Sequence, residues 1–182
     1  MRKLILFILI AVLVSAGNIF PAAARQTAVI QLNEVLATED GFLSFQVPSD
    51  WYLTVSSEES QTLLLAASDA ERASNWQGAG SIIFHAYLDS GDSVQVDALV
   101  NKTLKDHALT GITLESESID IMGLPATRYT GENNSLKTLL IIAEIPESNQ
   151  HLRFVATADS AQWDDDFVSA VVNTLTVLPQ QA

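Results

Sequence analysis

Apolar and polar residues alternate along most of the chain, and this period of two predicts β-strands. In "FLSFQV" the side chains of Leu43, Phe45 and Val47 share one face. Asp-Gly precedes this run and favours a hairpin with "VIQLNEVLA" (Val29–Ala37), whose own period fits strand or helix. Further strands are predicted at Trp51–Ser57, Gln61–Ser68, Ser81–Leu88, Ile112–Gly123, Met122–Gly131, Leu136–Pro146 and His151–Ala158. The alternation breaks near Ser118, which predicts a bulge or a change of register there.

The stretch Val47-Pro48-Ser49-Asp50 predicts a turn, because proline has no N–H for a strand ladder and its φ suits the second turn position. Trp51 follows on the same face as Leu53. We therefore expect Trp51 to lie over the core as a lid at this corner, the alternative being an exposed aromatic platform for a ligand.

Two segments change to a helical period. In Asp92–Leu109 a stripe that includes Leu99 and Thr103 predicts a helix, with Asp92 as its cap and Gly111 after its end. A closing helix is predicted over Asp159–Leu178, capped by Asp159 or Ser160 and ended by Pro179, although β-branched residues near its end weaken it. Strands with two helices predict an α+β fold, an antiparallel sheet with helices packed on its faces.

The first residues have the order of a secretory signal peptide: two basic residues, an apolar run and a cluster of alanines. We expect residues 1–24 to be removed after Ala24 and the protein to be exported, either periplasmic or extracellular. A retained anchor is the alternative, but a membrane-spanning helix needs about 20 apolar residues and this run is shorter. Residues 25–38 are expected to form an N-terminal segment and the first strand, and residues 39–179 a single domain. The chain has no cysteine, so packing alone must stabilise it.

The chain is strongly acidic. Nine basic and 22 acidic residues give a formal charge of 9 − 22 = −13, and loss of two basic residues with the signal would give 7 − 22 = −15. This charge disfavours nucleic acid and anionic membrane surfaces as partners. Its simplest role is solubility, and the alternative is an acidic docking face for a basic partner.

No pattern of a cofactor site, metal site or nucleophile is found in the sequence. The three histidines, His85, His107 and His151, are predicted on different elements, with His107 favoured as a cation at a helix end. Asp164–Asp166 suits a helix N-terminus better than a calcium site, and Asp89–Val94 lacks the spacing of a calcium loop. "GAGS" (Gly78–Ser81) enters a strand, so it does not form a phosphate cradle.

Three stretches together resemble the PsbP-like family: "GFLSFQVPSDW", "IMGLPATRYTG" with a Gly-x-Pro-Ala turn at Gly123–Ala126, and "FVSAVVNTLTVL". The resemblance spans Glu39–Pro179 and its motifs are structural, not catalytic. It implies an α/β/α sandwich that binds or assembles without chemistry of its own. A shared fold does not transfer a function.

We therefore expect an exported, non-enzymatic accessory domain that contacts a protein or an envelope component through loops at one sheet end. The expected contacts are Trp76, in a long polar loop at Asp69–Gly80, and the corner near Trp51. Trp76→Ala is expected to leave the melting temperature nearly unchanged and Trp51→Ala to lower it. A secreted hydrolase and a calcium-dependent accessory protein are the alternatives.

Overall fold

The computed structural model describes residues 30–58, 61–77, 80–90, 95–146 and 148–178. The proposed signal peptide and its cleavage site lie outside these residues. The described chain is a mostly antiparallel α+β fold, as the sequence predicts, and none of its described helices is long and apolar enough to cross a membrane. Its strands are β1 (Glu34–Ala37), β2 (Leu43–Val47), β3 (Tyr52–Glu58), β4 (Gln61–Ala67), β5 (Ile83–Ser90), β6 (Leu114–Ile121), β7 (Leu124–Glu132), β8 (Leu136–Ile145), β9 (Gln150–Asp159) and β10 (Thr176–Val177). Its helices are α1 (Ala70–Ser74), α2 (Val96–Asp106), a 3₁₀ turn η1 (Ser160–Gln162) and α3 (Asp165–Val172).

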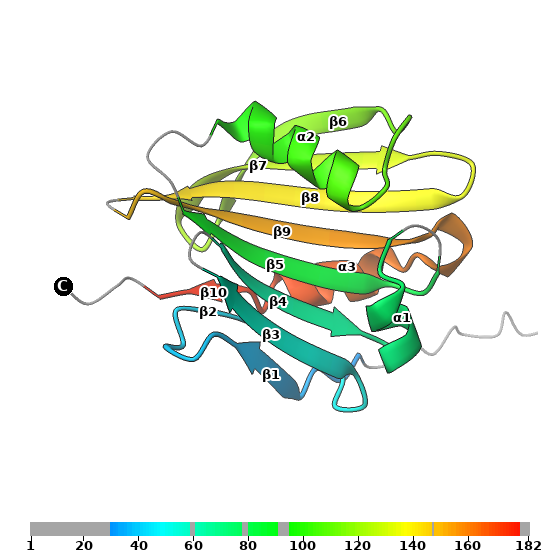
Figure 1. The fold of residues 1–182 in the computed structure, drawn as a ribbon, viewed down its shortest axis with the longest axis horizontal. Helices are drawn as coiled ribbons and strands as arrows, with labels where there is room; N and C mark the ends of the chain where they lie inside the picture. The colour runs from blue at the N-terminus through cyan, green and yellow to red at the C-terminus, as the bar shows by residue number, and fades with distance from the viewer. Residues whose placement is uncertain (1–29, 59–60, 78–79, 91–94, 147, 179–182) are drawn as a thin grey trace, which may run out of the picture.

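A seven-stranded antiparallel sheet forms the middle layer, in the order β3-β4-β5-β9-β8-β7-β6. Helices α1 and α2 lie on one side of it, which we call the α2 side and which faces the viewer in Figure 1. Helix α3 and a three-stranded sheet, β1-β2-β10, lie on the other, which we call the α3 side. The described chain is thus layered about one large sheet.

The hairpin predicted from Asp-Gly is confirmed, because β1 pairs antiparallel with β2. The turn after β2 does not join neighbours in one sheet. It carries the chain from the small sheet into β3 of the large sheet, and its hydrogen bond runs from the Trp51 N–H to the Pro48 carbonyl. Pro48 is therefore the first residue of the turn, not the second as predicted.

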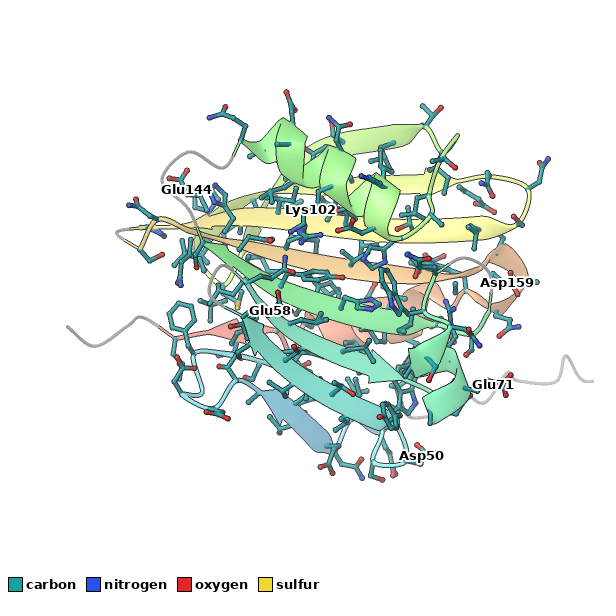
Figure 2. The ribbon with its side chains drawn as sticks, viewed as in Figure 1. Asp50, Glu58, Glu71, Lys102, Glu144 and Asp159 are labelled. Carbon is teal, nitrogen blue, oxygen red and sulfur yellow. The ribbon has the colours of Figure 1, made fainter. Side chains whose placement is uncertain are left out.

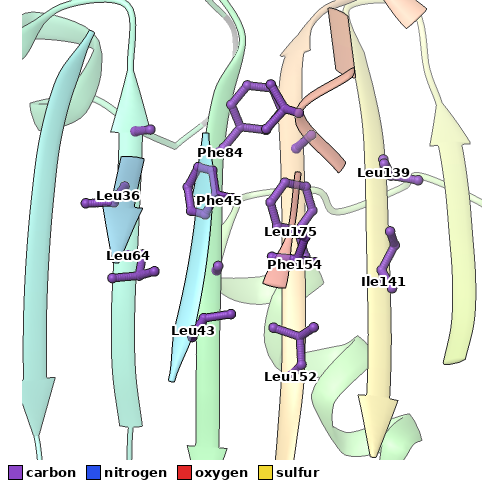
Figure 3. Close-up of a cluster of buried hydrophobic side chains, with 14 of the residues drawn as sticks. Leu36, Leu43, Phe45, Leu64, Phe84, Leu139, Ile141, Leu152, Phe154 and Leu175 are labelled. Atoms are coloured by element: carbon purple, nitrogen blue, oxygen red, sulfur yellow. The ribbon is translucent and has the colours of Figure 1, made fainter. Parts of the chain in front are cut away.

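The core of the α3 side is aromatic and apolar (Figure 3). The Phe45 ring meets the Phe154 ring edge-on, with centroids 5.7 Å apart, and Phe84 packs against both rings. All three side chains are fully buried. Trp51 closes one end of this core by stacking on Phe84 at 5.6 Å, so the predicted lid is confirmed.

The predicted closing helix is wrong in its second half. Helix α3 ends at Val172, and Thr176 and Val177 form β10, which pairs with β2. Thr174 Oγ1 accepts a hydrogen bond from the Gln46 N–H at 2.8 Å. Strand pairing uses the β-branched residues that weaken the helix. The cap is also different, since Asp164 Oδ1 accepts from the Phe167 N–H at 3.0 Å.

Helix α2 has different ends from those predicted. Its N-cap is Gln95, without a side-chain cap bond, and Asp92 lies outside the described residues. The helix ends at Asp106, and the left-handed residue that follows it is Ala108, with φ 53°, and not Gly111. The Leu109 N–H donates a hydrogen bond to the Leu104 carbonyl oxygen at 2.8 Å. This bond is typical of the Schellman motif at a helix C-terminus.

The bulge predicted near Ser118 is absent from the described ladder, because β6 and β7 pair without a break from Leu114–Gly131 to Ile121–Leu124. Most side chains of β6 are exposed on both faces, so its sequence need not alternate strictly. Met122 (φ 56°) and Gly123 (φ 78°) form the two-residue turn between these strands. Positive φ at both positions is the mark of a type I′ hairpin turn.

Candidate functional site

The α2 side of the sheet contains a buried polar cluster. Strand β5 alternates, so that Phe84, Ala86 and Leu88 face the α3 core while His85, Tyr87 and Asp89 face α2. Strand β9 adds Arg153, which is paired with Tyr87 in the ladder. Elements far apart in sequence thus bring ionisable groups together under one helix.

The centre of this cluster is an ion pair. The Arg153 side chain is fully buried; its Nε donates to Asp89 Oδ2 at 2.9 Å and its Nη2 to Asp89 Oδ1 at 3.1 Å. Its Nη1 donates to Thr103 Oγ1 at 3.1 Å, and its guanidinium carbon lies 3.9 Å from the Tyr87 ring centroid. Burial opposes ionisation of Asp89, but the hydrogen bonds and charge of Arg153 outweigh burial and hold the pKa of Asp89 below its ordinary value. These three hydrogen bonds hold the Arg153 guanidinium between Asp89 of β5 and Thr103 of α2.

Two histidines meet beside this ion pair, although the sequence predicts them on different elements. The rings of His85 and His107 have centroids 4.7 Å apart, and each residue is 1% exposed. Burial, with the charges of Arg153 and Arg72, lowers the pKa of His107 to about 3, and burial also lowers the pKa of His85. His107 is therefore a neutral buried group and not the helix-end cation predicted. Its Nε2 lies 3.1 Å from the Tyr87 hydroxyl, while both ring nitrogens of His85 lack a partner among the described residues.

This histidine pair does not match a metal centre or a hydrolase site. No group of three or more potential ligands occurs in the part of the chain that the structure describes, and the nearby guanidinium of Arg153 would repel a cation. His107 bonds to a tyrosine, and neither histidine has a described hydrogen bond to both a serine and a carboxylate. The arrangement packs rings and fixes α2 to the sheet.

Trp76 belongs to this cluster rather than to an extended exposed loop. The predicted loop at Asp69–Gly80 contains α1, whose N-cap is Asp69, and residues 78–79 lie outside the described part. The half-buried Trp76 ring lies 4.8 Å from His107 and 5.2 Å from His85, and packs near Leu65. Trp76 is therefore a partial cover of the histidine pair, and only its exposed part is free to contact a partner.

The aspartates of the closing helix serve that helix. All three lie at its N-terminus, as predicted, with Asp165 and Asp166 in the first turn, but the N-cap is Asp164 and not Asp159 or Ser160. Asp165 accepts hydrogen bonds from Trp163 Nε1 at 2.7 Å and from Lys137 Nζ, and these bonds lower its pKa. The other acidic stretch is Asp89–Val94, of which residues 91–94 lie outside the described part of the chain. Its first residue, Asp89, forms the ion pair with Arg153.

A cavity of about 350 Å³ lies elsewhere, on the α3 side, between α3 and strands β6, β7 and β8. This volume is at the small end of the range for ligand pockets. The floor is apolar and the rim is polar, with Asp120 and Ser169 among the rim residues. Apolar residues lining the cavity include Ile119, Ile121, Leu139, Ile141, Val172 and Leu175.

One wall of this cavity is Arg128, on β7. Its Nη1 lies 3.4 Å from Glu117 Oε1 on β6, in an ion pair exposed to solvent. Its Nε is buried and has no hydrogen-bond partner in the described part of the chain. Since an unpaired buried donor is costly, this N–H is a ready donor to an acceptor that enters the cavity.

The sequence alone did not indicate this cavity, because its residues come from three strands and a helix that only tertiary packing brings together. A weak signal exists. Arg128 is a charge on the face of β7 that continues the apolar core, in register with Ile141 of β8. A charge on a predicted core face is a reason to suspect a site.

The fold defines the class of the protein as an antiparallel α+β domain, and the cavity below α3 is lined by apolar and polar residues. No family model matches the chain, and no curated protein matches it. The chain is similar to a solved structure from Bacteroides thetaiotaomicron VPI-5482, with 13% identity, coverage of 82% of this chain and a TM-score of 0.41. The chain spans 50% of that protein's length. A likeness at this level identifies neither a family nor an activity.

Proposed function

We propose that this chain is an exported, non-enzymatic accessory domain of the PsbP-like fold, and that it docks on a basic segment of an envelope protein. The observation that carries the proposal is the cavity between α3 and β6–β8, with its apolar floor and a polar rim that includes Asp120 and Ser169. An apolar side chain of the partner fills the cavity. The Arg128 Nε donates to a backbone carbonyl beside that side chain.

Charge selects the partner. The chain carries a formal charge of −13, and acidic side chains such as Asp50, Glu58, Glu71 and Glu144 lie around the molecule (Figure 2). Near the cavity, Glu117 is exposed and Asp120 lies on the rim. A basic segment is attracted by this field and an acidic one is repelled.

The proposal is tested with two synthetic peptides, one alternating leucine with lysine and one alternating leucine with glutamate. We expect the lysine peptide to bind and the glutamate peptide not to bind, measured by calorimetry. Ser169→Trp places a large ring over the cavity from an exposed position and should weaken binding more than tenfold, whereas Ser169→Ala should not.

Two results would contradict the proposal. Equal binding of the lysine peptide by Ser169→Trp and by the unmodified protein would place the contact outside the cavity. Equal binding of both peptides would remove charge as the basis of selection. Mass analysis of the protein from an exporting host tests removal of residues 1–24 separately.

A further inference from the structure

The two edges of the seven-stranded sheet differ in how they are protected. At one edge, β6 carries Glu115, Glu117 and Asp120 along its eight residues. Charged side chains at an edge prevent pairing with another strand. At the other edge, β3 carries no charge from Tyr52 to Ser57.

Strand β3 also lacks the other protective features of an edge. Its sequence has no proline, and its ladder with β4 runs without a bulge from Tyr52–Ala67 to Glu58–Gln61. Its residues are aromatic, β-branched or hydroxyl-bearing in the main, which suits a paired strand. Edges of this kind are templates for another strand.

The centre of this edge is open on both faces. Val55 is opposite Leu64 of β4 and points to the α3 side, yet it is 41% exposed. Ser56 is opposite Leu63 and points to the α2 side, and it is also exposed. Neither layer of the described chain therefore covers the middle of β3.

We propose that the occupant of this edge is β3 of a second copy of the chain, paired antiparallel about Val55. This register places Val55 opposite its own copy, Thr54 opposite Ser56 and Leu53 opposite Ser57. The full strand is then paired, and the two Glu58 side chains lie at opposite ends, each across from a Tyr52. The pattern is self-complementary, as a two-fold interface requires.

The same pairing at β6 would bring acidic side chains of two copies together. The uncharged β3 edge is the one at which two copies of so acidic a chain can meet. Because the remaining charge still repels, dimerisation should strengthen as salt rises. The dimer is independent of the proposed docking cavity, which lies at the β6 side of the sheet.

Sedimentation of the purified protein tests the proposal, at about 100 µM protein and in low salt and about 0.5 M salt, where the Debye length is below about 8 Å. We expect a dimer whose dissociation constant falls at high salt. Val55→Lys places two like charges opposite each other and should raise the dissociation constant more than tenfold. Val55→Thr, an uncharged β-branched control, should leave it nearly unchanged.

Ser116→Lys is the matched control on the other edge, because Ser116 is also exposed on an edge strand. It should leave the dimer intact. A monomer in both salts overturns the proposal, and so does a dimer that Val55→Lys does not weaken. Urea unfolding of each variant shows that the change in assembly does not come from loss of the fold.

Discussion

The two sides of the large sheet are built from the same strands but have different chemistry. On the α3 side, Phe84 packs among other aromatic rings, and the core is stabilised by apolar contact. On the α2 side, the neighbouring His85 and Asp89 lie in a buried layer of ion pairs and hydrogen bonds. Apolar packing is non-directional and insensitive to pH, whereas a buried polar layer depends on every partner and on protonation. The comparison predicts that the α2 side is the one that responds to pH and to loss of a single charged partner.

The largest expected effect is on the ion pair. Asp89→Ala leaves the Arg153 charge buried without its carboxylate and should lower the free energy of unfolding by about 3–5 kcal/mol. The double variant Asp89→Leu with Arg153→Met removes both charges and should be less destabilised than Asp89→Ala. Urea unfolding measures these variants together with the two single changes, Asp89→Leu and Arg153→Met. A double variant that is as unstable as the sum of its single changes would show that the two charges are not coupled.

Trp51 and Trp76 lie on opposite sides of the sheet, so substituting each one compares the stability that the two sides contribute. Trp51 stacks on Phe84 and lies 5.4 Å from Phe167, so Trp51→Ala should lower the free energy of unfolding by about 3 kcal/mol. Trp76 covers the histidine pair, so Trp76→Ala should cost about 1 kcal/mol instead of the negligible loss predicted from the sequence. Trp51→Phe and Trp76→Phe keep a ring and serve as controls. Thermal melts measure the losses. If Trp76→Ala lowered the melting temperature more than Trp51→Ala, the expected order of the two sides would be wrong.

The smallest expected effect is the change in stability with pH. The pKa of His107 is lowered on folding to about 3, so the unfolded chain binds a proton that the folded chain refuses. Stability is therefore full above the unfolded pKa of about 6.5 and falls as pH falls, by about 2 kcal/mol from His107 between pH 7 and pH 5. His85 acts in the same direction.

Unfolding midpoints measured between pH 7 and pH 5 give the slope of stability against pH. His107→Gln should flatten it, because the titrating group is removed, while Lys105→Gln, an exposed change in the same segment, should preserve it. An unchanged slope in His107→Gln would mean that other groups control the acid sensitivity.

The alternation of residues determined most of the strands. Runs such as Leu136–Ile145 are rich in apolar and β-branched residues, which favour a strand, and Asp-Gly indicated the first hairpin. The place of Asp164–Asp166 at a helix N-terminus was also predictable, because acidic residues there are favoured locally, although the cap itself is Asp164 and not Asp159 or Ser160. Trp51 was predictable because a turn and a strand period placed it over apolar neighbours.

Tertiary structure alone decided the remainder. Thr176 and Val177 became a strand because β2 offered them a partner more than 100 residues away in sequence, which no local propensity reveals. His85 and His107 met because a strand and a helix end pack together, and the cavity at Arg128 formed from three strands and α3. Local sequence decides most of the helices and strands, since turns, caps and periodicity act over a few residues, but not β10, which needs β2 as its partner. Which side chains meet depends on packing between distant elements, and that packing sets burial, charge and the candidate site.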